Sequence, residues 1–442
     1  MYIKKIKVKN FKCFDENEVE FSIPNGKEGS GLNIFVGENN SGKSSLFEAM
    51  HFIRNQAKKD IRKIGKDDGN EFYVEQTFVG NIESNIDNFV QENKKESFKK
   101  CLLEEDGKIC FKVRRDFKNE SEAKKVLFLE DGTYKNSTGI DGVFQKFFQI
   151  SNIWADTNPE NESKFGSTTI CGNLLADISE KFKSDNEDYD NFLSEFNKMF
   201  NDDSSGLQLD LNKVASETEE ILNEQFGNAK LKFKFNNPEP NILFKNIQIL
   251  VNDGEETDIS EKGHGLQRTI ILSLLQVYAK RITQIEDGEG NVVIKPHFLF
   301  IDEPEMGLHP QAQKKLFNAL KILSKTHQIF ISTHSENFIS LDVIENIYKL
   351  NNKEDRIIIN SVKNFDIDLR ENRNFFFHHH KIFFTDKAIF VEGIDDYERY
   401  PIFCELNNYK ELKKDFYLMN GCSAHKKFRE FCDYFGIKSY FI

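Results

Sequence analysis

The chain has 442 residues, a formal net charge of −12, a sequence pI near 5.5, and 38% hydrophobic and 30% charged residues. This balance excludes a wholly basic nucleic-acid coat protein and a disordered chain, while local basic patches stay open. The seven cysteines form no CxxC pair, and no apolar stretch reaches the ~18 residues that span a bilayer. We therefore expect a cytoplasmic protein of roughly three domains, without disulfides, a zinc ribbon or a membrane span, whose 43 phenylalanines fill core positions.

The first 57 residues predict the start of an α/β domain. Residues 2–9 alternate apolar side chains with lysines, the period of a half-buried strand, and residues 11–21 continue into a hairpin partner. Residues 32–36 form a short apolar run, which is typical of a strand buried on both faces. Apolar residues then recur at helical spacing, so we expect a helix over 43–55 that packs against the sheet.

A phosphate-binding loop stands between this strand and this helix. It reads Gly37-Glu-Asn-Asn-Ser-Gly42-Lys43-Ser44, a complete GxxxxGK[ST] motif. Glycines let backbone N–H groups turn inward around phosphates, and the helix N-terminus adds its positive end. We expect Lys43 to reach the β- and γ-phosphates of ATP and Ser44 to ligate Mg²⁺. The candidate nucleotide-binding residues are Gly37, Asn39, Asn40, Ser41, Gly42, Lys43, Ser44 and Ser45.

Residues 58–239 are rich in charge and asparagine and predict an insertion or arm. Hairpin-like pieces come first, and helices are expected over 173–182, 189–200 and 211–226. The lysine-rich run at 58–66 could contact DNA phosphates through charge alone, but a solvated helix end is the preferred account.

Residues 240–368 alternate strands and helices, which predicts a mostly parallel sheet. The apolar strand 298–301 delivers Asp302 and Glu303 at the strand end where ligands bind in open α/β sheets. Asp302 is expected to hold Mg²⁺ through its water shell. Glu303 is the candidate general base that polarises the attacking water.

Two further motifs belong to the same segment. Lys262-Gly-His-Gly-Leu-Gln-Arg268 opens an apolar helix whose N-terminal amides can bind an anion; its candidate nucleotide contacts are Gly263, Gly265 and Gln267. The strand 329–332 is followed by His334, about 30 residues after the acidic pair. A lone histidine is more often a satisfied surface or core residue, but this position favours a switch that hydrogen-bonds the γ-phosphate or the attacking water.

Residues 369–385 are read as a linker, and residues 386–442 restart a βαβαβ pattern, so a second α/β domain is expected. Glu392 lies at the end of its first strand, where it could bind a metal or act as a base. The run His378–His380 invites a metal interpretation, which we do not favour, because three successive side chains point in different directions and cannot close around one ion.

Together these motifs resemble a known group of ATPases. The opening IKVKNFK, the phosphate loop, GHGLQR, IDEPEMGLHP and ISTHS are similar to RecF/SMC-related ATPases, and more closely to the OLD (overcoming lysogenisation defect) family of ATP-dependent nucleases. The resemblance implies an ABC-type P-loop head with an α+β or helical insertion, followed by a Toprim-like domain. It implies ATP and Mg²⁺ as cofactors, DNA as a partner and a role in defence against phage. Gln76 is a candidate for the Q-loop glutamine.

The resemblance also implies a homodimer or higher oligomer with composite ATP sites. Gly263 and Gly265 of one subunit would cap the ATP that the other subunit's phosphate loop holds. In the family the insertion usually mediates this dimerisation.

The Toprim resemblance begins at Lys387-Ala-Ile-Phe-Val-Glu392-Gly-Ile-Asp-Asp396 and is incomplete. In the family a DxD pair follows the strand that corresponds to 438–442, whereas no DxD follows Glu392 here, and Asp395 and Asp396 sit beside the glutamate. A two-metal cleavage site needs several converging carboxylates, so nuclease activity and a second divalent metal at Glu392 stay open.

Two explanations account for the incomplete Toprim pattern. We expect a chain truncated from a longer nuclease, because a sheet that ends within a buried strand leaves an exposed edge; a degenerate domain is the alternative. The alternative function is a RecF-like DNA-binding or signalling ATPase that recruits a separate effector or nuclease subunit.

Overall fold

A computed structural model describes residues 1–54, 71–105, 107–116, 126–136, 144, 148–154, 187–226, 230–238, 247–282, 285–286, 292–293, 296–353, 356–365, 379–409, 415–419 and 425–442. The chain divides into two compact units. The first comprises residues 1–156 and 279–442, and the second residues 157–278.

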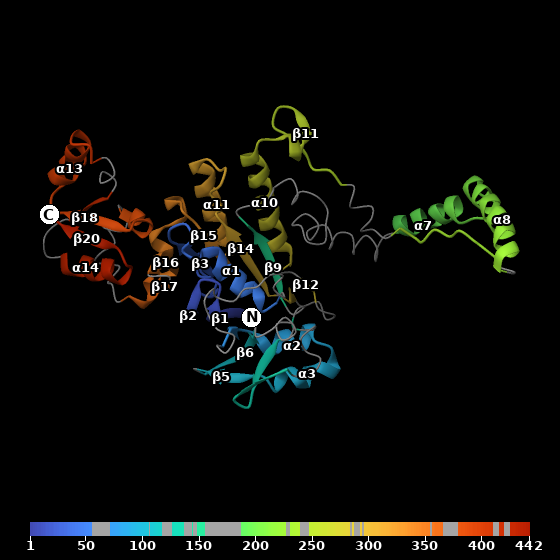
Figure 1. Cartoon of the computed structure of the whole chain (residues 1–442), viewed down its shortest axis with the longest axis horizontal. Helices are drawn as coiled ribbons and strands as arrows, with labels where there is room; N and C mark the ends of the chain where they lie inside the picture. The colour runs from blue at the N-terminus through green and yellow to red at the C-terminus, as the bar shows by residue number, and fades with distance from the viewer. Residues whose placement is uncertain are drawn as a thin grey trace. The chain divides into compact units, whose positions relative to one another are not determined.

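A six-stranded sheet forms the centre of the first unit, in the order β17-β16-β3-β15-β14-β9 (Figure 1). Its strands are β3 (Leu32–Val36), β9 (Gln149–Ile153), β14 (His297–Asp302), β15 (Gln328–Ser332), β16 (Ile347–Lys353) and β17 (Arg356–Ser361). The strands from β16 to β9 pair in parallel, and β17 pairs antiparallel with β16. Every residue of β3, β14 and β15 is buried, as expected of parallel strands covered on both faces. The predicted α/β fold class is confirmed.

A second, antiparallel sheet follows the order β2-β1-β4-β6-β7-β8, with β5 beside β6. Its strands are β1 (Tyr2–Phe11), β2 (Phe14–Glu20), β4 (Tyr73–Val79), β5 (Leu103–Glu105), β6 (Lys108–Asp116), β7 (Leu127–Glu130) and β8 (Thr133–Lys135). Two short helices, α2 (Ile82–Phe89) and α3 (Glu92–Lys99), follow β4. In β1 the apolar residues Ile3, Ile6 and Val8 are buried between partly exposed lysines, so this strand has the predicted half-buried period.

Aromatic side chains join the two sheets into one core around helix α1 (Lys43–Phe52). Phe47 of α1 packs edge-on against Phe35 and Phe300, with ring centroids 5.6 and 5.4 Å apart. Phe300 and Phe330 stack across neighbouring strands at 4.7 Å. Such pairs add about 0.5–1.5 kcal/mol each to the burial of their area. These phenylalanines fill core positions, as the composition predicts.

The structure differs from the expected insertion over 58–239. β4 pairs with β1 and β6, while β9 pairs in parallel with β14. Because the backbone hydrogen bonds of a sheet recruit these strands, the described residues between 71 and 154 belong to the same unit as the phosphate loop, and the separate unit starts at 157. The lysine-rich run 58–66 and the helix expected over 173–182 lie outside the described residues.

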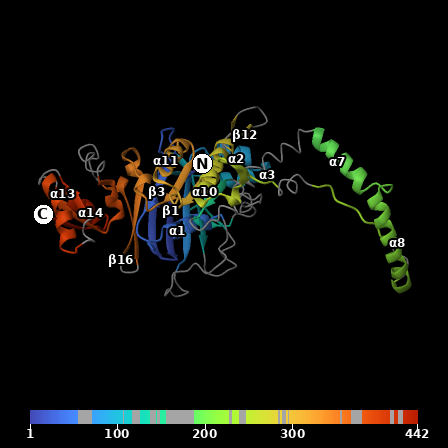
Figure 2. The ribbon, with the colours of Figure 1, turned by 90° about the horizontal axis from the view of Figure 1, so that it is seen from above.

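The second unit contains the helices α7 (Glu187–Phe200) and α8 (Gly206–Phe226), which follow one another with a bend (Figure 2). Residues 230–238 run back along them, since Asn201 and Phe235 exchange two hydrogen bonds and Tyr189 donates to the Pro238 carbonyl. A hairpin of β10 (Leu250–Asn252) and β11 (Glu256–Asp258) precedes helix α10 (His264–Ile282).

Residues 386–442, the C-terminal module, fold in the predicted βαβαβ order within the first unit. The elements are β18 (Lys387–Val391), α13 (Ile394–Leu406), β19 (Phe416–Leu418), α14 (His425–Tyr434) and β20 (Lys438–Phe441). The strands are parallel in the order β19-β18-β20. The β16–β17 hairpin holds the module, because Asn351 donates to the Phe435 carbonyl at 2.8 Å and Lys349 donates to the Thr385 carbonyl at 2.6 Å.

Candidate functional site

The phosphate loop joins β3 to α1 at the carboxyl end of the central sheet. Gly42 caps the helix at φ 95°, a left-handed conformation that favours glycine. A Cβ added to Gly37 would lie 2.4 Å from the Leu350 carbonyl oxygen and 2.7 Å from Ser41 Oγ. The loop therefore needs glycine at 37 for space and at 42 for its backbone conformation.

The polar groups of the loop suit an anionic ligand. Lys43 Nζ donates to the carbonyls of Gly37 at 2.8 Å and Glu38 at 2.9 Å. Burial lowers the pKa of Lys43, while Glu303 and Asp302 oppose this shift. Ser41 Oγ is buried and has no hydrogen-bond partner. A buried hydroxyl without a partner is costly, and a phosphate oxygen is an acceptor that would satisfy it. The loop thus fits the phosphates of ATP.

Hard oxygen ligands meet beside this loop. Ser44 Oγ donates to Asp302 Oδ2 at 2.9 Å, which joins the first turn of α1 to the end of β14. Ser332 Oγ, at the end of β15, donates to Asp302 Oδ1. Mg²⁺ prefers such oxygen ligands and is usually bound by one or two carboxylates together with substrate phosphates. Ser44 and Asp302, the predicted Mg²⁺ residues, therefore lie together and fit the ion.

Glu303 and His334 face each other at the same sheet edge, with 3.8 Å between Glu303 Oε1 and His334 Nε2. Glu303 has a φ of 49°, and its N–H donates to the Ser332 carbonyl at 3.0 Å. A left-handed conformation in a non-glycine residue costs about 1–3 kcal/mol and often marks a functional site. Burial and then Lys43 lower the pKa of His334, while Glu303 raises it. The net shift favours the uncharged imidazole of His334.

Glu305 also belongs to this edge, although the motif analysis did not select it. Its Oε2 accepts a hydrogen bond from Thr333 Oγ1 at 2.8 Å, and its Oε1 accepts one from the His334 N–H at 2.6 Å. The signal in the sequence was a third acid in IDEPE, two residues after Glu303. Nothing in that spacing shows that the carboxylate turns toward the loop after β15.

Gly263, Gly265 and Gln267 lie at the N-terminus of α10 in the second unit. A Cβ added to Gly263 would meet no atom within 4 Å, so space is open there. Gln267 is 3% exposed, and its Nε2 donates to the carbonyls of Ser260 and Lys262. The amide nitrogen of Gln267 therefore stabilises the turn before its own helix, and the nucleotide contact of Gln267 stays a prediction.

Two other candidates have structural partners. Gln76, the candidate Q-loop glutamine, is 1% exposed, and its Nε2 donates to the Met50 carbonyl, so it ties β4 to α1. His379 is buried, and its Nε2 accepts from the Leu418 N–H at 3.3 Å. His380 lies 3.7 Å from Glu336 instead. The two described histidines of the run thus have different neighbours, whereas His378 lies outside the described residues.

Glu392 lies exposed just after β18, as predicted. Among the residues that the structure describes, no group of three or more His, Cys, Asp or Glu side chains could hold a metal ion. Glu392 therefore belongs to no such group in the described part of the module.

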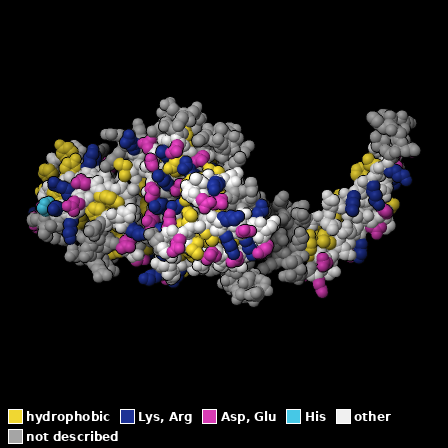
Figure 3. Space-filling view, turned by 90° about the horizontal axis from the view of Figure 1, so that it is seen from below, with side chains coloured by type: hydrophobic (Ala, Val, Ile, Leu, Met, Phe, Trp, Pro, Cys, Tyr) yellow, Lys and Arg dark blue, Asp and Glu magenta, His cyan; other side chains and the backbone are white. Residues whose placement is uncertain are grey.

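The lysines of the opening strand have acidic partners. Lys5 Nζ lies 2.7 Å from Glu18 and Lys7 Nζ 3.2 Å from Glu16, across the β1–β2 pair. On the face shown in Figure 3, lysine and arginine side chains are interspersed with carboxylates. Because these lysines are paired with acids, the β1–β2 surface is not a continuous basic stripe for nucleic-acid phosphates.

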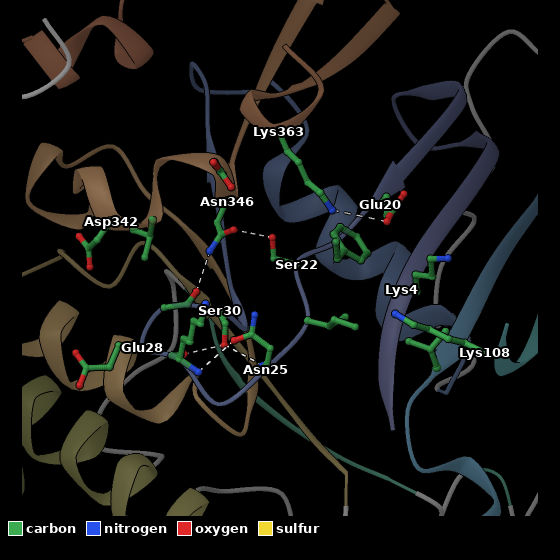
Figure 4. A pocket seen from close by; sticks show the side chains of 17 residues that line it. Lys4, Glu20, Ser22, Asn25, Glu28, Ser30, Lys108, Asp342, Asn346 and Lys363 are labelled. Atoms are coloured by element: carbon green, nitrogen blue, oxygen red, sulfur yellow. Dashed lines mark hydrogen bonds and ion pairs between the residues drawn. The ribbon is translucent and has the colours of Figure 1, made fainter. Parts of the chain in front are cut away.

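A separate cavity of about 490 Å³ opens at the amino end of β3, opposite the phosphate loop (Figure 4). Its polar side chains bond mostly to one another. Ser22 Oγ donates to Asn346 at 2.7 Å, Asn346 Nδ2 donates to the Gly29 carbonyl, and Lys363 lies 3.8 Å from Glu20. Because equal numbers of lysines and acids line the cavity, it favours neither an anion nor a cation as a ligand. The four lysines are Lys4, Lys27, Lys108 and Lys363, and the four acids are Glu20, Glu28, Asp342 and Glu345.

Comparisons with known proteins agree with this geometry. A family profile described as an AAA ATPase domain matches residues 1–339. The Old nuclease of Escherichia phage P2 is 30% identical over 321 residues, which cover 69% of this chain and 53% of that protein. The OLD nuclease of Thermus scotoductus is 25% identical over 243 residues, 52% of this chain and 43% of that protein. The chain thus spans about half the length of these curated relatives, and its resemblance to OLD nucleases is confirmed.

Solved structures give weaker similarity. Stu0660 of Streptococcus thermophilus has a TM-score of 0.46 at 10% identity and covers 96% of this chain and 99% of its own. The SMC head domain from Thermotoga maritima has a TM-score of 0.39 at 14% identity, with 82% and 99% covered. None of the helices in the described part of the chain combines the length and apolar character needed to cross a bilayer.

Proposed function

The chain belongs to the family of AAA ATPase domains, and on that premise we propose that its phosphate loop binds ATP with Mg²⁺ and that the ends of β14 and β15 hydrolyse it. The observation that carries this proposal is the hydrogen bond between Ser44 and Asp302, 258 residues apart in the sequence. Ser44 Oγ and Asp302 Oδ2 lie 2.9 Å apart, and a hydroxyl with a carboxylate is the ligand pair expected for a nucleotide-bound Mg²⁺.

The residues divide the work by position. When ATP binds, Lys43 replaces its hydrogen bonds to the two loop carbonyls with bonds to β- and γ-phosphate oxygens. Ser41 donates its hydroxyl to a phosphate oxygen. Mg²⁺, when bound, neutralises charge on the phosphates. Glu303 accepts the proton of the attacking water, and neutral His334 orients that water or the γ-phosphate beside it.

Two substitutions test this proposal. Lys43→Ala removes the ammonium group and should abolish ATP binding in a fluorescent-nucleotide titration. Glu303→Gln should bind ATP with an affinity within about threefold of the natural protein but hydrolyse it at least about 100-fold more slowly, since it loses the base. Lys27→Ala, a lysine at the other end of β3, is the matched control. Normal ATP turnover by either site variant contradicts the assignment.

We further propose that the ATPase is OLD-like, that it controls DNA binding or cleavage in the cytoplasm, and that it acts in defence against phage. The support is 30% identity with the Old nuclease of phage P2. In this proposal the protein acts as a homodimer with composite sites, in which Gly263 and Gly265 contact the ATP of the other subunit. Sedimentation of Glu303→Gln with and without ATP tests it, and a species that stays monomeric with ATP counts against it.

A second candidate is a RecF-like ATPase that binds DNA without cutting it and recruits a separate effector. Its support is that Glu392 belongs to no group of three or more metal-ligating side chains among the described residues. Plasmid cleavage in Mg²⁺ or Mn²⁺ separates the two. Cleavage that Glu392→Gln abolishes supports the nuclease and a second metal at Glu392. DNA binding without cleavage supports the second candidate.

A further inference from the structure

The loop that carries His334 is held at both ends by residues that follow β14. Residues 333–337, here called the histidine loop, begin where β15 ends. At its start, Glu305 accepts the Thr333 hydroxyl at 2.8 Å and the His334 N–H at 2.6 Å. These two bonds attach the loop to the segment that carries Glu303.

The far end of the histidine loop is held by Gln313 of α11 (Pro310–Leu323). Gln313 Oε1 accepts from Ser335 Oγ at 2.7 Å and from Asn337 Nδ2 at 2.9 Å. Its Nε2 donates to the Leu308 carbonyl at 2.9 Å. Gln313 is 9% exposed, so its rotamer is restricted by packing. The loop is thus anchored twice to one segment, residues 303–313.

We propose that Glu305 is a positioning residue for ATP hydrolysis, which acts through His334 by fixing the backbone from which that side chain extends. This inference rests on the proposed ATPase site. Glu305 itself does not contact the nucleotide.

The physical reason is that packing alone does not orient His334. Its side chain is 34% exposed, and it lies 3.8 Å from Glu303, just beyond hydrogen-bond distance. A small rotation of the loop therefore decides whether the imidazole meets the water that Glu303 activates. Hydrogen bonds from N–H or O–H to a carboxylate are about twice as strong as neutral ones, and Glu305 makes two of them to adjacent residues.

The same two contacts distinguish Glu305 from the acid proposed for Mg²⁺. Both of its carboxylate oxygens accept bonds from the histidine loop. Asp302 is instead the acid that meets Ser44.

The test compares three variants of the full chain by ATP turnover and by ATP affinity. Glu305→Ala should lower kcat by about 10- to 100-fold, because a misplacement of 1 Å costs about that much, and should leave ATP affinity within about threefold. Glu305→Gln keeps an acceptor oxygen for the His334 N–H and should recover most of the rate. Glu28→Ala, which removes a surface carboxylate 2.9 Å from Lys325, should change nothing.

A double variant isolates the route through His334. If Glu305 acts only by placing that side chain, Glu305→Ala adds less than about twofold to the loss caused by His334→Ala, since contacts in one network are not additive. A multiplicative loss in the double variant overturns the inference. It is also overturned by an unchanged kcat of Glu305→Ala, by a full rate in His334→Ala, or by no rescue in Glu305→Gln.

The inference and the proposed function fail in different ways. If Glu303→Gln hydrolyses ATP normally, the site itself is misassigned. If Glu303→Gln is slow while Glu305→Ala is normal, the site stands and only the positioning role is lost. Thermal unfolding of Glu305→Ala serves as a further readout: a midpoint that drops in parallel with ATP affinity assigns Glu305 a merely structural role and overturns the inference.

Discussion

The ends of β14 and β18 look alike in the sequence but differ in three dimensions. Each is a buried parallel strand followed by a carboxylate, Asp302 with Glu303 in one and Glu392 in the other. At β14 the neighbouring elements supply polar partners, since Ser44 and Ser332 both donate to Asp302.

At β18 the neighbouring strands supply apolar residues instead. The Met419 N–H donates to the Val391 carbonyl, and the Ile442 N–H donates to the Phe390 carbonyl, so Met419 and Ile442 flank the end of β18. Among the described residues, the two strand ends thus have different neighbours. The chemistry depends on which side chains the adjacent strands and helices bring to the same edge.

Removing an aromatic ring from β14 and removing one from β18 should lower the free energy of unfolding by similar amounts. Phe300 of β14 is 1% exposed and Phe390 of β18 is fully buried, each stacked on a neighbouring ring. Phe300→Ala and Phe390→Ala should each cost about 3–5 kcal/mol of stability, measured by urea unfolding. Ile358→Ala on the surface of β17 is the control. A loss below 1 kcal/mol at Phe390 would mean that the C-terminal module lacks a packed core of its own.

Neutralising Asp302 and Glu392 in turn should affect ATP hydrolysis very differently at the two strand ends. Asp302→Asn should reduce ATP hydrolysis by about 100-fold or more, because it removes the carboxylate proposed for Mg²⁺. Glu392→Gln should leave the rate within about twofold, since Glu392 is not part of the proposed ATP site. Steady-state phosphate release measures both. Equal losses in the two variants would contradict the contrast between the strand ends.

The serine beside Asp302 should matter less. Ser332→Ala removes one hydrogen bond to the carboxylate and should weaken Mg²⁺ binding by about 1.5 kcal/mol, roughly tenfold, visible as a higher Mg²⁺ concentration needed for hydrolysis. Ser439→Ala, on β20 opposite Ala388, is the matched control in the other sheet. If neither serine variant changes the Mg²⁺ requirement, the hydrogen bond from Ser332 to Asp302 is not needed for hydrolysis.

The smallest effect concerns Lys349, which connects the two regions through the Thr385 carbonyl. Burial lowers its pKa to about 8, below the usual 10.5. Between these values the unfolded chain binds more protons than the folded one, so stability should rise as pH increases from 8 to 10.5. Lys349→Met should flatten this rise in urea midpoints. An identical pH slope in the variant would show that folding does not lower the pKa of Lys349.

The local motifs were predictable because they depend on short-range physics. The apolar runs of β3, β14 and β15 specify buried strands, and the spacing from Gly37 to Ser44 specifies a turn of inward N–H groups before a helix. The order strand–acid–strand–histidine then identifies the residues that meet at one sheet edge.

Long-range pairing determined the rest. No local pattern shows that β9 inserts beside β14, that Gln76 bonds to Met50, or that Glu305 turns toward His334. Each depends on backbone or side-chain partners distant in the sequence, and the hydrogen bonds that select them exist only after the sheets assemble. The sequence by itself thus determined the phosphate loop and the acids that serve it. The tertiary structure decided that Ser44 and Ser332, from separate elements, both donate to Asp302.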